Sequence, residues 1–337
     1  MEMNPKVSVL IPVYNGESTI ESAVESILRQ SFCDFEIVII NDGSTDSTPS
    51  ILDYLSKRDK RINVIHTPQR GIISALNTGI ELCRADLIAR MDADDISHPQ
   101  RLELQFDLMT NQPEVSVCSS LVRMFPRKDL LGGLVKYEEW LSSLISSDDI
   151  ARDMLVESPV AHPSVMLRKS ELIEIGGYQE RGWPEDYDLW LRYHAAGKRF
   201  IKVPHTLLFW RQAEGRLTFA DSRYSVENFL RAKAYYLARM LKDSDRPIVL
   251  WGAGKTGRRL CKHLIREGLS LESIVDIDTS KIGHAMRGIP IVGMDYLENK
   301  RNLFVIQAVG SRRARELIRE QLKVYGYTEL QDFICAA

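Results

Sequence analysis

The sequence predicts an α/β protein, with a mostly parallel sheet in its first part and a second, smaller α/β domain at its end. From residue 7 to residue 90, β-branched apolar runs alternate with amphipathic helical patterns, which is typical of a parallel sheet covered by helices. A strand followed by a glycine-rich turn and a helix begins again at Ile248. The length of 337 residues also suggests about two domains.

The composition is that of an ordinary globular protein, with 44% hydrophobic and 27% charged residues. A net charge of -2 gives no reason to expect a nucleic-acid partner. The five cysteines are odd in number and contain no C-x-x-C pair. We therefore expect reduced thiols, and neither a disulfide framework nor a zinc site.

The first apolar run, residues 7–13, is much shorter than a signal or membrane-spanning segment. We expect a cytoplasmic protein, and peripheral contact with the inner membrane face stays open.

The first domain is predicted to contain four strands in a βαβαβαβ order, at residues 7–13, 35–40, 62–65 and 86–90. A helix beginning at residue 17 or 18 has apolar side chains on one face, and residues 72–82 form another helix. Ligands of such sheets bind beyond the carboxyl ends of the strands. Three segments follow strand ends and should face one crevice: Pro12-Val13-Tyr14, Asn41-Asp42-Gly43 and Asp92-Ala93-Asp94-Asp95.

The acidic run at Asp92, Asp94 and Asp95 can be interpreted in two ways. Crowded carboxylates repel unless a cation or backbone N–H groups neutralise them, so the run can hold a hard divalent metal such as Mg²⁺ or Mn²⁺. Alternatively, it is an acidic turn that caps a helix over residues 96–109. The residues alone leave both interpretations open.

Several motifs in order resemble the inverting family 2 glycosyltransferases of GT-A fold, across about the first two thirds of the chain. They are Val-Ser-Val-Leu-Ile-Pro-Val-Tyr-Asn at 7–15, Asn-Asp-Gly-Ser-Thr-Asp at 41–46, Asn77-Thr78-Gly79-Ile80, the run Asp92–Asp95, Ala-His-Pro-Ser-Val-Met-Leu-Arg at 161–168, Gly176-Gly177-Tyr178, and Pro-Glu-Asp-Tyr-Asp-Leu-Trp-Leu-Arg at 184–192. The resemblance implies a GT-A type nucleotide-diphospho-sugar transferase fold.

The resemblance also implies roles for the residues at the strand ends. Asp94 would be the main metal ligand, with Asp92 near the ribose and the metal, and Asp95 supporting the turn or the waters of the metal. The donor site would further include Pro12, Val13, Tyr14, Asp42, Arg70 and Arg211. In this set Asp42 would receive the base, since a carboxylate can accept a hydrogen bond from a ring N–H. Alternatively, or in addition, Asp42 caps a helix or forms a turn.

The catalytic base implied by the resemblance is Asp186, oriented by Glu185. The acceptor hydroxyl must lose a proton as it attacks, so a carboxylate away from the metal is needed. With one base and no obvious nucleophile, we expect a single displacement that inverts the anomeric carbon. The alternative is that both acids simply begin a helix at 187–195, where the dipole favours them.

His162 and Trp183 are candidates for contact with the acceptor or the diphosphate, although a structural hydrogen bond explains His162 equally well. Two positions depart from the family pattern. Ala213 stands where the family often has a histidine, which removes a metal ligand. Leu76 stands where many members have an arginine, and Arg70 is a partial substitute.

The domain boundaries are predicted from composition. Residues 1–222 form the GT-A domain, 223–245 a linker helix and hinge, and 246–337 a smaller Rossmann-like α/β domain. The linker helix has a modest apolar face and charges of both signs, which favours packing between domains or in a homodimer over membrane anchoring.

The last domain contains a G-x-G-x-x-G pattern at Gly252, Gly254 and Gly257, directly after an apolar strand at 248–251. Asp276 and Asp278 follow the third glycine by 19 and 21 residues, the spacing of the acid that contacts a ribose in dinucleotide binders. One interpretation is a bound nucleotide or NAD that regulates the enzyme. The other is a fold retained for packing or oligomerisation.

The leading hypothesis is a metal-dependent, inverting glycosyltransferase that uses a nucleotide sugar, expected to be UDP-linked. Its acceptor would be a glycan or a lipid-linked sugar in surface polysaccharide synthesis. Two alternatives stay open: an NAD-dependent oxidoreductase or regulatory nucleotide-binding protein that uses the C-terminal domain, and a binding protein that has lost its catalytic residues.

Overall fold

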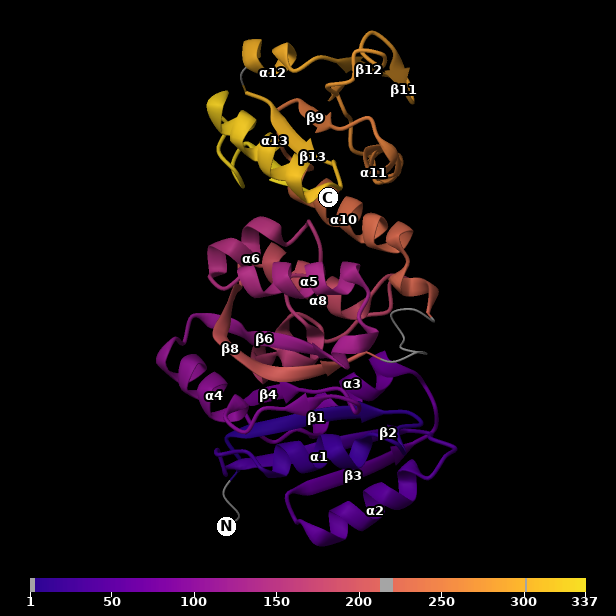
Figure 1. Ribbon diagram of the computed structural model, residues 1–337, viewed down its shortest axis with the longest axis vertical. Coiled ribbons are helices and arrows are strands. Elements are labelled where there is room, and N and C mark those ends of the chain that lie inside the picture. The colour runs from indigo at the N-terminus through magenta and orange to yellow at the C-terminus, as the bar shows by residue number, and fades with distance from the viewer. Residues whose placement is uncertain (1–3, 213–220, 301) are drawn as a thin grey trace. The chain divides into compact units, whose positions relative to one another are not determined.

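The computed structural model describes residues 4–212, 221–300 and 302–337, and its contacts divide the chain into two compact units (Figure 1). The first unit contains the chain through residue 150, together with 159–181 and 188–212. The second contains 151–158, 182–187 and the described residues from 221 onward. The chain therefore changes unit within two of its helices, α6 (Ser147–Asp153) and α8 (Glu185–Ala195).

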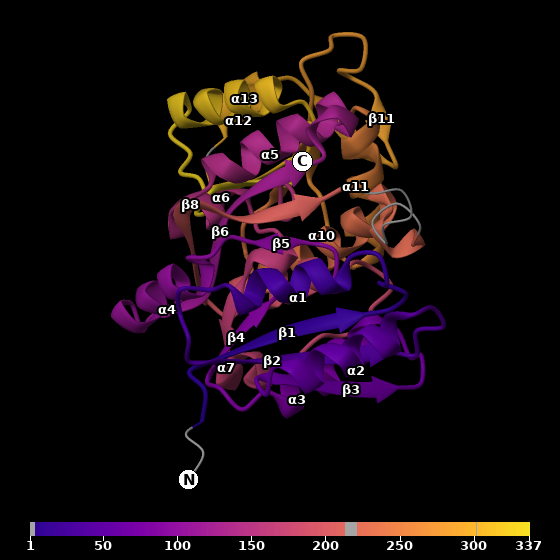
Figure 2. The ribbon, with the colours of Figure 1, turned by 60° about the horizontal axis from the view of Figure 1, so that its bottom comes forward.

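The first unit is built on an eight-stranded sheet in the order β3-β2-β1-β4-β7-β6-β8-β5. Its strands are β1 (Val7–Val13), β2 (Phe35–Asp42), β3 (Ile62–Thr67), β4 (Leu87–Arg90), β5 (Ile96–Ser97), β6 (Val115–Phe125), β7 (Met166–Arg168) and β8 (Arg199–Arg211). Figure 2 shows β1, β2 and β3 side by side. These three strands and β4 pair in parallel, as their apolar runs predicted.

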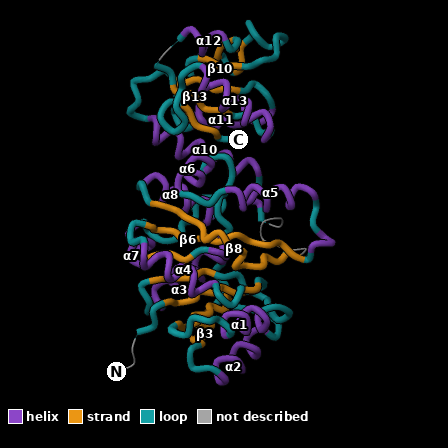
Figure 3. The backbone as a smooth tube through the Cα atoms, turned by 60° about the vertical axis from the view of Figure 1, so that its left-hand side comes forward, coloured by secondary structure: helices purple, strands orange, loops and turns teal. Residues whose placement is uncertain are grey.

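The other half of this sheet is mixed rather than parallel. Strand β7 is antiparallel to both β4 and β6, whereas β6 and β8 run parallel to each other, side by side in Figure 3. The prediction of a mostly parallel sheet therefore holds for the first four strands only. The pairing of β6 with β8 contains register shifts.

Helices cover both faces of the parallel half. The helices of the first unit are α1 (Ile20–Leu28), α2 (Thr48–Arg58), α3 (Ile72–Leu82), α4 (Arg101–Asn111), α5 (Gly132–Ser143) and α7 (Lys169–Glu174), with short 3₁₀ turns at Arg127–Asp129 and His162–Ser164. Alternate residues of β1, from Val7 to Val13, join the core formed with α1 and α2. On the opposite face, α3 packs so closely that a Cβ at Gly79 would lie 2.1 Å from Leu10 Cδ1.

The second unit contains a six-stranded sheet in the order β11-β12-β10-β9-β13-β14. Its strands are β9 (Ile248–Trp251), β10 (Ser273–Val275), β11 (Ala285–Met286), β12 (Ile289–Val292), β13 (Phe304–Gln307) and β14 (Phe333–Cys335). All neighbours pair in parallel except the edge strand β11. If the five parallel strands are numbered 1 to 5 along the chain, their order across the sheet is 3-2-1-4-5. The direction of the order therefore reverses between β9, the first of them, and its neighbour β13.

The remaining helices belong to the second unit. They are α10 (Val226–Leu241), α11 (Lys255–Arg266), α12 (Asp295–Asn299) and α13 (Arg312–Val324), preceded by a 3₁₀ turn at Ser222–Tyr224. Lys233 of α10 is buried and donates hydrogen bonds to the carbonyls of Val156 and Ala336. No helix of the described residues is long and apolar enough to cross a bilayer. The predicted three-part division of the chain stays a prediction.

Candidate active site

The acidic run follows β4 directly and brings three carboxylates together. Oxygens of Asp92, Asp94 and Asp95 all lie within 4.8 Å of one another. The turn begins at the carboxyl end of the sheet, where the N–H of Met91 still donates to the carbonyl of Leu10 on β1 (3.0 Å). Asp95 is buried, while Asp92 and Asp94 are half-buried. Carboxylate oxygens in this arrangement are the donor set that Mg²⁺ and Mn²⁺ prefer.

Two arginines hold the acidic turn in place. Arg90 is only 4% exposed, and its Nη2 lies 2.6 Å from Asp92 Oδ1. At the end of β8, the backbone N–H of Arg211 donates to Asp95 Oδ1 (2.7 Å), and its Nε donates to the carbonyl of Asp94 (2.7 Å). Arg211, predicted to bind the diphosphate, thus lies beside the predicted metal ligands. Asp95 thus links the acidic turn to the end of β8, and its predicted role stays a prediction.

The loops after β1 and β2 are tied to each other by hydrogen bonds. The N–H of Asn15 donates to Ser44 Oγ (2.9 Å), and the N–H of Thr45 donates to Asn15 Oδ1 (2.8 Å). Asn15 has a positive φ of 51°, which turns the chain after β1. Pro12 and Val13 belong to β1, and Tyr14 after them is 46% exposed. The two loops therefore form one connected surface at the carboxyl ends of β1 and β2.

Asp42, the last residue of β2, holds the neighbouring loop before α3. It is 5% exposed, and its two oxygens accept the N–H groups of Arg70 and Gly71, each at 2.8 Å. Asp42 therefore fixes the loop that carries Arg70, and this loop begins α3. Arg70 itself is exposed. A carboxylate oxygen that accepts one hydrogen bond keeps a second lone pair, so this arrangement is compatible with a bound base.

His162 has a structural hydrogen bond in the first unit. Its Nε2 lies 2.7 Å from Tyr178 Oη, and the side chain is 6% exposed. Burial and, to a smaller extent, the charge of Arg90 lower the pKa of His162 well below its usual value, so the ring is neutral. Asn77 holds the partner loop through reciprocal hydrogen bonds with the backbone of Tyr178, both 2.9 Å. His162 orients the 176–178 loop.

Glu185 and Asp186 lie in the second unit, at the first turn of α8. Glu185 is 2% exposed, and the hydroxyl of Tyr224 donates to its two oxygens at 2.8 and 2.9 Å. Burial, together with the charge of Glu185, raises the pKa of Tyr224, so this hydroxyl keeps its proton. Asp186 is half-buried, and its Oδ1 accepts the N–H of Tyr187 (2.7 Å). Both acids therefore lie at the start of α8, and the role of Asp186 as the base stays a prediction.

Trp183 precedes this turn and is 6% exposed. Its ring lies 5.4 Å from that of Tyr235, and the guanidinium of Arg231 lies over it at 5.7 Å. Much of its surface is thus occupied by α10. The predicted departure at Ala213 lies outside the described residues.

The residues that hold these side chains are not evident from the sequence pattern. The one available signal is Arg90, a charged residue at the end of the apolar run Leu-Ile-Ala-Arg, which indicates a carboxylate partner. Nothing in the sequence connects Tyr224 with Glu185, which is 39 positions away.

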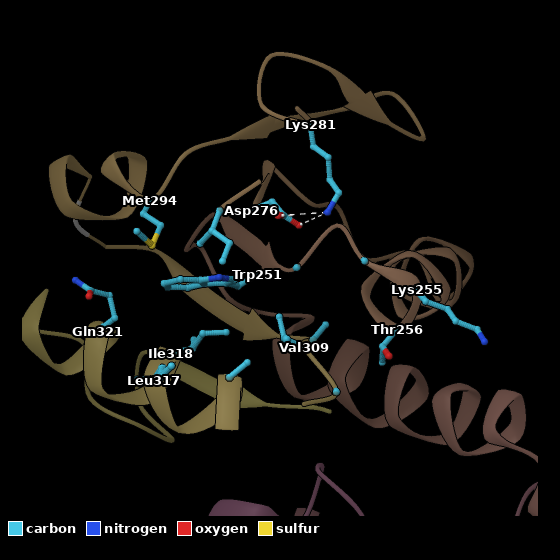
Figure 4. Close-up of a pocket in the computed structure, with 16 residues that line it drawn as sticks. Trp251, Lys255, Thr256, Asp276, Lys281, Met294, Val309, Leu317, Ile318 and Gln321 are labelled. Carbon is cyan, nitrogen blue, oxygen red and sulfur yellow. Dashed lines mark hydrogen bonds and ion pairs between the residues drawn. The ribbon is translucent and has the colours of Figure 1, made fainter. Parts of the chain in front are cut away.

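The predicted nucleotide-binding residues of the C-terminal domain separate into two groups. Gly252, Gly254 and Asp276 line a cavity of the second unit (Figure 4). Gly257 does not line it and instead packs against the carbonyl of Gly252. Asp278 does not line that cavity; its side chain accepts hydrogen bonds from Ser280 and pairs with Lys281.

A parallel half-sheet whose β4 ends in an acidic turn, extended by a mixed half, defines the class of GT-A nucleotide-sugar transferases. Solved structures agree with this class. The S. aureus TarS 1-349 complex with UDP-GlcNAc has a TM-score of 0.54 and 17% identity, covering 77% of this chain and 72% of that one. The Pyrobaculum calidifontis mannosyltransferase PcManGT, in complex with GDP-Man and Mn²⁺, has a TM-score of 0.50 and 19% identity, covering 73% and 67%. At such identities the likeness concerns the fold.

The chain belongs to the glycosyl transferase family 2, whose model matches residues 8–175. Among its relatives is the Escherichia coli UDP-Gal:alpha-D-GlcNAc-diphosphoundecaprenol beta-1,3-galactosyltransferase, which is 33% identical over 72% of this chain and 87% of the relative. The protein is therefore a glycosyltransferase. The oxidoreductase alternative is not favoured.

Proposed function

We propose that the protein is an inverting, metal-dependent glycosyltransferase that transfers a sugar from a UDP-linked donor to a glycan or lipid-linked acceptor in surface polysaccharide synthesis. The observation that carries the proposal is the acidic turn after β4, with Asp92, Asp94 and Asp95 within 4.8 Å. The E. coli relative supports the donor and acceptor classes, because its name contains a UDP-sugar and a lipid-linked acceptor. The Mn²⁺ complex of the mannosyltransferase supports the metal.

The donor site is assigned to the first unit. Asp94 would be the main metal ligand, with Asp92 beside it, and a metal held there would stabilise the charge of the leaving diphosphate. Arg211, which already contacts the acidic turn, would bind the diphosphate. Asp42, Arg70 and the end of β1, from Pro12 to Tyr14, would hold the nucleoside.

The base is assigned to Asp186, with Glu185 and Tyr224 holding its turn. The acceptor hydroxyl oxygen forms a bond to the anomeric carbon while the bond from that carbon to the diphosphate oxygen breaks. The hydroxyl proton passes to the carboxylate of Asp186, and the diphosphate leaves with the electron pair. Attack opposite to the leaving group inverts the configuration.

Substitution Asp186→Asn tests this assignment, because it keeps the shape but removes the proton acceptor. We expect kcat to fall about 100-fold or more while donor binding is retained. Turnover is measured with UDP-sugars and a short-chain prenyl diphosphate sugar as acceptor, and the product anomer is determined by NMR. Asp148→Asn is the matched control, since Asp148 is an exposed acid in the first turn of α6. Unchanged turnover of Asp186→Asn, or a product with retained configuration, would contradict the assignment.

A further inference from the structure

The second unit contains a cavity that the glycosyltransferase reaction does not use. It has a volume of about 440 Å³, within the range of about 300–1,000 Å³ that is usual for small-molecule sites. It is lined by residues that follow β9 (Gly252, Gly254), β10 (Asp276, Ile277) and β13 (Ala308, Val309, Gly310). These strand ends lie where the order of the sheet reverses, the position at which open α/β sheets bind ligands.

The three glycines of the turn differ in whether the backbone conformation or the packing of the protein requires glycine at that position. Gly252 has a φ of +122°, which other residues rarely adopt. A Cβ at Gly257 would lie 1.8 Å from the carbonyl oxygen of Gly252, so close packing of α11 on the turn requires glycine there. Gly254 has an ordinary φ of -78°, and a Cβ there would meet nothing within 4 Å.

The fold therefore gives no reason for glycine at 254, whereas a ligand would. In dinucleotide-binding turns the first glycine makes the tight turn, the second lets the backbone approach a diphosphate, and the third allows helix and strand to pack. Gly252 and Gly257 show the first and third of these properties. Gly254, the second glycine, lines the cavity and has open space at its Cβ position, which leaves room for a diphosphate.

The walls of the cavity fit a planar, partly apolar group. Figure 4 shows Met294, Leu317 and Ile318 gathered toward the ring of Trp251. Ile277 and Leu317 are also 70% and 59% exposed, although both are apolar and line the same cavity. Exposed apolar side chains on two sides of a hollow are typical of a ligand site. A nucleobase is a planar group of this kind.

The polar side of the cavity fits a ribose and phosphates. Asp276 accepts the N–H of Ala253 (2.7 Å) and of Asp278 (2.9 Å), so its carboxylate is fixed at the glycine turn. Two further hollows adjoin the cavity, since one shares Lys255 with it and the other shares Lys281. Arg258 and Arg287 line both of these hollows. Lys281 pairs with Asp276 and Asp278, and Lys262 pairs with Glu227, whereas no ion pair seen among the described residues involves Lys255, Arg258 or Arg287. These three unpaired cations make the rim of the cavity attractive to anions.

From these observations we infer that the second unit binds a nucleoside diphosphate group at this cavity, as a site separate from the donor site of the first unit. The base would lie between Ile277 and Leu317, the ribose beside Asp276, and the phosphates over Gly254 at the start of α11. Within the described part of the second unit, the sheet has five parallel strands, with one nucleotide-binding half before the order reverses. A mononucleotide therefore fits better than NAD. Because this site contains one carboxylate and nearby lysines, its binding does not require a divalent metal.

Calorimetric titration of the full chain tests the inference. UDP, GDP, dTDP, ADP and NAD⁺ are each titrated in EDTA, with Asp94→Ala present so that the metal-dependent donor site does not contribute. We expect one diphosphate to bind at one site per chain. Gly254→Asp should weaken this binding at least tenfold, because it places a carboxylate where the phosphates would lie. Leu317→Ser should weaken it through loss of the apolar wall.

Two matched controls separate binding from folding. Gly133→Asp adds the same side chain at a glycine whose Cβ also meets nothing within 4 Å, and Val324→Ser changes an apolar residue of α13 that is 78% exposed and does not line the cavity. Both should bind as the parent does. The inference is wrong if none of the diphosphates binds in EDTA, if Gly254→Asp binds as tightly as Gly133→Asp, or if NAD⁺ binds more tightly than every diphosphate. Since the donor site requires metal and Asp94, failure of one site leaves the other testable.

Discussion

At the residue scale, Glu185 is a buried acid held by one tyrosine hydroxyl at the first turn of α8. Both of its oxygens accept the Tyr224 hydroxyl, and Glu185 is 2% exposed. Tyr224→Phe removes this hydrogen bond to the buried carboxylate, which costs about 1.5–3 kcal/mol of unfolding free energy. We expect turnover to fall as well, because the turn that carries Asp186 loosens. Chemical denaturation and steady-state kinetics measure the two effects.

Tyr54→Phe is the matched control for this prediction, because Tyr54 is 56% exposed. It should change the free energy of unfolding by less than about 0.5 kcal/mol. Equal effects of the two substitutions would show that the Tyr224 hydroxyl has no special role.

The buried, neutral His162 predicts a pH dependence of stability. Its pKa in the folded protein is lowered by burial, whereas the unfolded chain takes up a proton near pH 6.5. Stability is therefore fully present above about pH 6.5 and is lost as the pH falls below it, by at most about 1.4 kcal/mol per pH unit. We expect His162→Gln to reduce this loss between pH 7.5 and 5. A variant with the same slope of unfolding free energy against pH as the wild type would contradict this account.

At the scale of the element, α3 must lie close to β1 to place Asn77 against the Tyr178 loop. Gly79 allows this approach, because a Cβ there would lie 2.1 Å from Leu10 Cδ1. Gly79→Ala should destabilise the protein by about 1–3 kcal/mol through overpacking, measured as a shift in the denaturation midpoint. Gly133→Ala, in the open first turn of α5, should be neutral or slightly stabilising. If Gly79→Ala is equally neutral, the close packing of α3 on β1 is not required.

Elements were predictable where periodicity and apolar runs were strong. Residues 7–13, 72–82 and 248–251 were predicted with the observed bounds. Residues 96–109 were expected to be one helix, but they contain the short strand β5 and then α4, since Ile96 and Ser97 pair with β8. The long strands β6 and β8 have polar residues such as Ser119, Ser120 and Lys202 in buried positions, so no simple alternation reveals them. Their pairing is a property of the tertiary structure.

At the scale of the whole molecule, the acidic turn was predictable because Asp92, Asp94 and Asp95 are close in sequence. Contacts over long separations were not, such as the hydrogen bond from Arg211 to Asp95 across 116 positions. The segments that make up the second unit are also not evident from their order in the chain. Residues 151–158 belong to it, and Asp153 there pairs with Arg319 of α13. Only packing of the folded chain brings such segments together.

The central claim is a metal-dependent nucleotide-sugar site at the acidic turn of the first unit. The most direct test is a titration of the protein with UDP, GDP and dTDP, each with and without Mn²⁺, in a Gly254→Asp background that removes the second site. We expect one diphosphate, UDP, to bind only with Mn²⁺. Asp94→Ala should weaken this binding at least tenfold, while Asp34→Ala, an exposed acid before the amino end of β2, should leave it unchanged. Binding that does not depend on Mn²⁺, or that persists in Asp94→Ala, would contradict the claim.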